Sequence, residues 1–133
     1  MGPMVGEYLY NNINKKGIYV YGNLKNNITY QNIDIILNKI NKHLNNSYII
    51  VIDSALSSKE NIGKIIINKN KMIIGSALNK LNYEIGDLSI KGVVGENKNS
   101  SVKNFNELNN VSINLIKNLS RQISNKIIQT LNV

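Results

Sequence analysis

Residues 48–56 read Tyr-Ile-Ile-Val-Ile-Asp-Ser-Ala-Leu, and this stretch decides the fold. The apolar run over 48–52 is continuous and not alternating, which is typical of a β-strand covered on both faces. We therefore predict a strand over 48–52 that ends at Asp53. A carboxylate directly after a buried strand is fixed by the sheet and partly desolvated, and both effects suit a general base. The alternative is a turn residue whose oxygens accept backbone N–H groups.

The sequence before this strand predicts two helices and one further strand. Apolar residues with a spacing of four, together with Pro3 in the first turn, predict a helix over 2–16. Residues 18–21 predict a short strand. A second helix is expected after Thr29, with His43 at its surface or boundary. Its apolar stripe consists of Ile33, Ile36, Leu37, Ile40 and Leu44.

The sequence after residue 56 predicts a hairpin, a strand and a long helix. Residues 62–67 and 72–74 flank the turn sequence Asn-Lys-Asn, which favours a β-hairpin. A strand is expected over 88–94, and one long helix from about Lys103 onward. Helices that alternate with strands predict a single α/β domain over residues 1–133, with a mainly parallel sheet and an antiparallel hairpin. In such sheets, ligands bind beyond the carboxyl ends of the strands.

The composition excludes several function classes. The 133 residues are 42% hydrophobic and 18% charged, which is typical of a globular domain. No apolar run is long enough to cross a membrane, and no charged-then-apolar signal segment opens the chain, so we expect a cytoplasmic protein. The absence of Cys excludes thiol catalysis and thiolate zinc sites, and a single His makes a poor basis for a metal site or a Ser-His-Asp triad. We predict no metal and no cofactor.

The net charge of +8 is a weak indication of nucleic-acid binding. Asn, Ile and Lys dominate the composition, and all three have AT-rich codons, so base composition alone explains the excess of lysine. The lysines are scattered, and Arg121 is the only residue of the type that makes bidentate phosphate contacts. We therefore expect no nucleic-acid partner.

Few residues are suited to catalysis. Asp53 is the best-placed carboxylate, and Asp87 is a second candidate, although an Asp after Gly86 is typical of a turn. Acid–base hydrolysis by carboxylates requires two of them close together, with one protonated. The small-residue loop over 75–77 is a weak candidate for binding an oxyanion through backbone N–H groups.

Several blocks of the chain, in order, resemble the YyaC-type sporulation proteins, which are relatives of the spore germination protease. Residues 52–63 resemble the Asp-centred segment of this family. Residues 75–81 are similar to its Gly-rich Asn-Lys loop, and residues 85–94 to its next block. The opening Gly-Pro-Met-Val-Gly and the segment 19–24 also fit. The resemblance covers about residues 1–95.

This resemblance implies a three-layer α/β sandwich of the phosphorylase/hydrolase type. It also implies a pair of catalytic Asp residues, one of which corresponds to Asp53. The position of the other falls before Met1, and the family's first β-strand is missing as well. Loss of that strand should leave unpaired backbone groups or force its neighbours together. The residues that we assign to binding on this basis are Ser54, Gly75, Ser76, Asn79 and Lys80.

Two functions follow as expectations. One is a peptidase of the aspartic type that uses Asp53 and acts on a protein or peptide in a sporulating cell or spore. The other is a catalytically inactive family member that binds or regulates a partner during sporulation. Ser89 stands where relatives tend to carry a His, which favours the second reading. An exposed sheet edge would also favour homo-oligomers.

Overall fold

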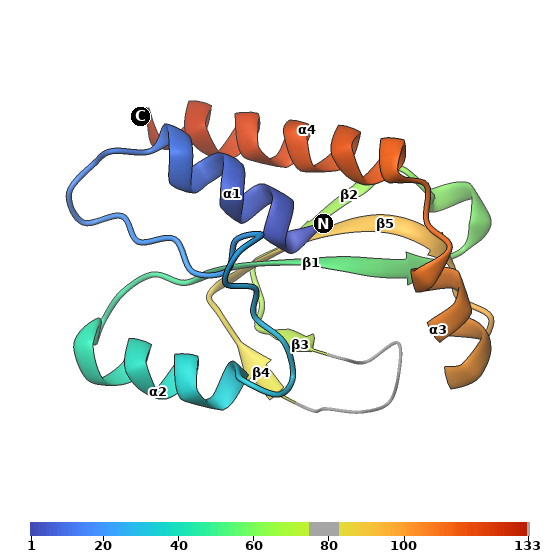
Figure 1. Cartoon of the computed structure of the whole chain (residues 1–133), viewed down its shortest axis with the longest axis horizontal. Helices are drawn as coiled ribbons and strands as arrows, with labels where there is room; N and C mark the ends of the chain where they lie inside the picture. Colours follow the sequence, from blue (N-terminus) through green and yellow to red (C-terminus); the bar gives the residue numbers. More distant parts are fainter. Residues whose placement is uncertain (75–82, 133) are drawn as a thin grey trace.

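The computed structural model describes residues 1–74 and 83–132. Its elements form a mixed α/β fold (Figure 1). In chain order they are α1 (Gly2–Asn12), α2 (Ile33–His43), β1 (Ile50–Ser57), the 3-10 helix η1 (Lys59–Asn61), β2 (Ile65–Asn68), β3 (Met72–Ile74), β4 (Tyr83–Ile85), β5 (Leu88–Glu96), α3 (Ser101–Asn109) and α4 (Ile113–Leu131).

The main sheet has the strand order β1-β5-β2. β5 lies in the centre, parallel to β1 and antiparallel to β2, so the sheet is mixed and not mainly parallel. The predicted hairpin over 62–74 is wrong. β2 pairs with β5, whereas β3 pairs with β4 in a separate two-stranded sheet. The Asn-Lys-Asn sequence therefore connects two sheets, because β5 offers β2 a longer apolar partner than the three-residue β3 does.

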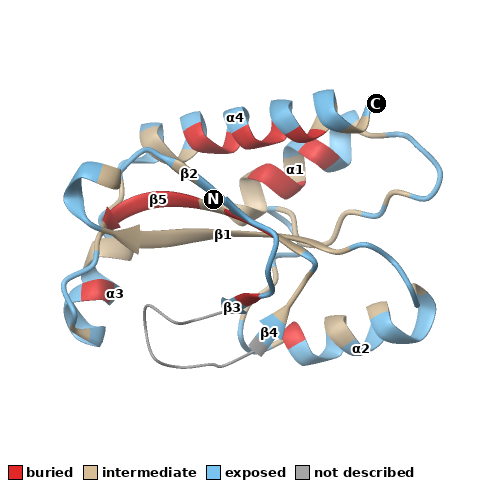
Figure 2. Ribbon diagram, turned by 180° about the vertical axis from the view of Figure 1, so that it is seen from behind, coloured by how far each residue is buried: buried red, intermediate tan, exposed pale blue. Residues whose placement is uncertain are grey.

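The hydrophobic core lies between the main sheet and the helices α1 and α4. Both helices run over the same face of the sheet (Figure 1). Buried residues concentrate on β5, α4 and α1 (Figure 2). The core cluster consists of Val5, Leu9, Ile90, Ile123 and Ile127. The helices α2 and α3 and the small sheet lie on the other side of β1 (Figure 1).

β1 is longer than the apolar run predicts. The strand continues to Ser57, so Asp53 lies in its middle and not at its carboxyl end. The reason is the parallel partner β5, which pairs with β1 in register from Ile50 to Ala55, with one irregularity before Leu56. Pairing with a neighbouring strand holds polar and apolar residues alike in extended conformation. The sequence of β1 itself does not show that β5 pairs with it.

Two other predicted elements differ from the structure. Residues 18–21 have no strand partner among the described residues and pass beside β1 without forming a ladder. The long C-terminal helix is two helices, α3 and α4, with a break over 110–112. The first helix is also shorter than predicted, since Ile13 is already extended. Asn residues disfavour a helix interior, and α1 ends at Asn11-Asn12.

β1 is an edge strand. Its only partner among the described strands is β5. At its other edge, a Cβ added to Gly2 at the start of α1 would lie 3.4 Å from the carbonyl oxygen of Ile52.

Candidate functional site

A groove of about 610 Å³ lies beside the edge of β1 that does not pair with β5. Residues 49–54 line it, whereas no residue of β5 does, so the groove lies on the side of β1 that faces away from the sheet. We call it the β1 groove. Apart from β1, its walls come from α1, from residues 17–22, and from α2 with the connections at either end. Ile85 of β4 and Ile127 and Leu131 of α4 also line it.

One wall of the β1 groove is the apolar stripe of α2. Ile33, Ile36, Leu37 and Ile40 all line the groove. Only Ile33 is fully buried, and the other three are half-buried. No described helix or strand packs extensively against α2. The stripe predicted from the sequence is therefore present, but much of it faces the groove and not a packed core. His43 is exposed, as predicted.

The opposite wall depends on a close contact between α1 and the segment 17–22. A Cβ atom added to Gly6 would overlap the carbonyl oxygen of Gly22 and lie 2.8 Å from its carbonyl carbon. Gly22 itself has a positive φ of 86°, a conformation that favours glycine. These two glycines let the backbone of the segment lie directly on α1, with Val20 and Tyr21 beside the groove.

Asp53 lies where β1 borders the groove. Its Oδ1 accepts a hydrogen bond of 2.8 Å from the backbone N–H of Ser54. Ile52 packs against the core, so Asp53, the next residue along the strand, points to the other face of the sheet. Burial raises the pKa of Asp53 above its usual value. The Ser54 N–H, Lys91 and the amino group of Met1 oppose this shift. Lys91 is its register partner on β5.

The structure does not bring Asp53 and Asp87 together. Asp87 Oδ2 accepts a hydrogen bond of 2.8 Å from Ile49 N, just before β1 begins, and so acts as a turn residue. Asp53 lies four residues further along the strand, a separation of about 13 Å. No other carboxylate perturbs the pKa of Asp53. The described residues therefore hold one desolvated acid and no acid pair around it.

Of the predicted binding residues, only Ser54 lies among the residues that the structure describes. Gly75, Ser76, Asn79 and Lys80 lie outside the described residues. Ser54 follows Asp53 on β1 and lines the groove. Ser89 is buried on β5, next to Val51 in register.

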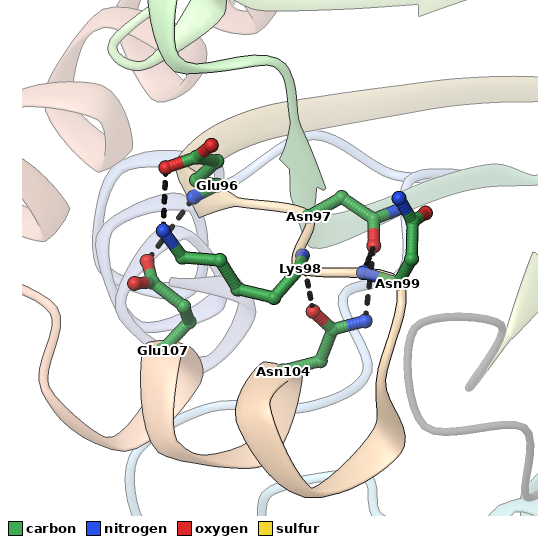
Figure 3. A network of polar contacts seen from close by, with 6 residues as sticks. All are labelled: Glu96, Asn97, Lys98, Asn99, Asn104 and Glu107. Atoms are coloured by element: carbon green, nitrogen blue, oxygen red, sulfur yellow. Dashed lines mark hydrogen bonds and ion pairs between the residues drawn. The ribbon is translucent and has the colours of Figure 1, made fainter.

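A polar network follows the carboxyl end of β5 (Figure 3). Asn104 on α3 accepts from Lys98 N at 2.8 Å and donates to Asn97 at 3.1 Å. Glu107 accepts from Glu96 N at 3.1 Å. Lys98 forms a 2.6 Å ion pair with Glu96, which raises the pKa of Lys98 and lowers that of Glu96. These contacts tie the loop after β5 to α3, which is a structural role.

The comparisons with known proteins place the chain in a family. A family described as "Protein of unknown function (DUF1256)" matches residues 1–126, nearly the whole length. The chain belongs to the DUF1256 family. This DUF1256 chain is also similar to "Uncharacterized protein YyaC" of Bacillus subtilis (strain 168), with 27% identity over 124 residues. The match covers 93% of the chain but only 58% of the relative. The predicted YyaC-type resemblance is therefore confirmed. No solved structure matches the chain significantly.

Two features are not found in the part of this DUF1256 protein that the structure describes. Over residues 1–74 and 83–132, no group of three or more His, Cys, Asp or Glu side chains is arranged to hold a metal ion. Among the same residues, no helix combines the length and the apolar character needed to span a membrane.

Sequence reasoning missed the β1 groove of the DUF1256 fold, although two signals for it exist. One is the continuous apolar run over 48–52, which suits a strand covered on both sides and yet lies at an edge. The other is the apolar stripe of α2, which has more apolar residues than its few contacts with other elements would bury. Both segments present more apolar surface than the described fold covers.

The raised pKa of Asp53 predicts how its replacement changes stability. Because its folded-state pKa lies above the unfolded value, ionisation of Asp53 is less favourable in the folded protein, and stability falls as the pH rises through that window. Asp53→Asn removes the charge and keeps an oxygen for Ser54. We expect its free energy of unfolding to exceed that of the wild type at pH 7, with no difference below the unfolded pKa near 3.8.

Urea unfolding at several pH values measures this difference. Glu60→Gln, at an exposed position, is the control and should change stability by no more than about 0.5 kcal/mol. A less stable Asp53→Asn protein at pH 7 would show that the charged carboxylate supports the fold.

Proposed function

We propose that this DUF1256 protein is a sporulation-associated binding protein that holds a peptide or protein segment. The observation that supports this proposal is the combination of a large apolar groove with a single carboxylate. Asp53 borders the groove, and no described carboxylate lies close enough to share a proton with it. Aspartic-type hydrolysis requires such a sharing pair.

The groove has the properties of a binding site. Ligand sites in proteins are typically concave, lined by apolar side chains, and about 300–1,000 Å³ in volume. The β1 groove falls within this range at about 610 Å³. Among the described residues that line it, Asp53 has the only charged side chain, and the amino group of Met1 interacts with Asp53. A surface with so few charged groups suits an apolar ligand and argues against nucleic acid.

The specific link to sporulation rests on the YyaC-type resemblance, as does the relation to the germination protease. The same resemblance suggests a three-layer sandwich with a further strand, and helices on both sides of β1 agree with this architecture (Figure 1).

A second candidate function is an aspartic-type peptidase. The observation that favours it is the raised pKa of Asp53, which is a property of catalytic acids. In that case the second acid would have to come from outside the described residues, and Asp53 would be the catalytic residue.

Genetic complementation separates the two functions. In a spore-forming host whose own copy is deleted, the binding function predicts a loss of heat-resistant spores that Asp53→Asn restores as well as the wild type does. The peptidase function predicts that Asp53→Asn fails. Spore yield and immunoblotting of protein levels are the measurements. A deletion strain with normal spores would contradict a role in sporulation.

A further inference from the structure

We draw no further inference here: the strongest candidate, the cleft between α3 and the start of α4 that Lys98, Lys103 and Ser112 line, would be an anion site resting on one helix N-terminus and two surface lysines, with no unpartnered buried polar side chain among the described residues of its lining.

Discussion

Replacement of Gly6 with valine is expected to lower the free energy of unfolding by at least about 3 kcal/mol and to prevent folding at moderate temperature. A Cβ at this position would overlap the carbonyl oxygen of Gly22. The obstacle is backbone on both sides, which no change of rotamer relieves. The helix and the segment 17–22 would have to separate, and the wall of the groove would open with them.

Urea unfolding followed by circular dichroism measures this loss. Gly2→Ala in the same helix is the control, because an added Cβ there meets only Ile52 O at an ordinary 3.4 Å. It should stay within about 0.5 kcal/mol of the wild type. Equal stability of Gly6→Val and Gly2→Ala would mean that the segment 17–22 does not rest on α1 in solution.

The sequence predicts those parts of the fold that carry a clear burial pattern of their own. The sequence predicts the strand over 88–94 and the helical character of the region after Lys103, although the structure divides that region into α3 and α4. Both segments carry strong patterns of their own. The α2 stripe was predicted for the same reason. Local periodicity is sufficient where the burial of one face decides the structure.

Features that depend on distant partners were not predictable. The strand β1 continues through Asp53 only because β5 pairs with it, more than thirty residues later in the chain. The segment 62–67 has the pattern of a hairpin strand, yet β2 joins β5 because the central strand offers more apolar surface. Pairing partners are a tertiary choice, and β-propensity does not specify them.

The site was predicted only in part, for the same physical reason. Asp53 was identified from its position after an apolar run, and it does border the groove, although in mid-strand. Asp87 was proposed as a second acid, but the register of β1 and β5 separates the two carboxylates. The groove itself combines segments from residues 1–22, 28–54 and the C-terminal helix. No single stretch of sequence contains that arrangement.

Replacement of Ile123 with alanine is expected to lower the free energy of unfolding by about 3 kcal/mol, within the range of about 2–5 for Ile→Ala in a core. Ile123 is 2% exposed on α4 and belongs to the core cluster with Val5, Leu9 and Ile90. Its removal leaves a cavity between α4, α1 and the sheet that close packing cannot fill. Ile113→Ala on the same helix is the matched control at 59% exposure, with an expected change below about 0.5 kcal/mol. Parallel urea titrations of the two variants test this contrast.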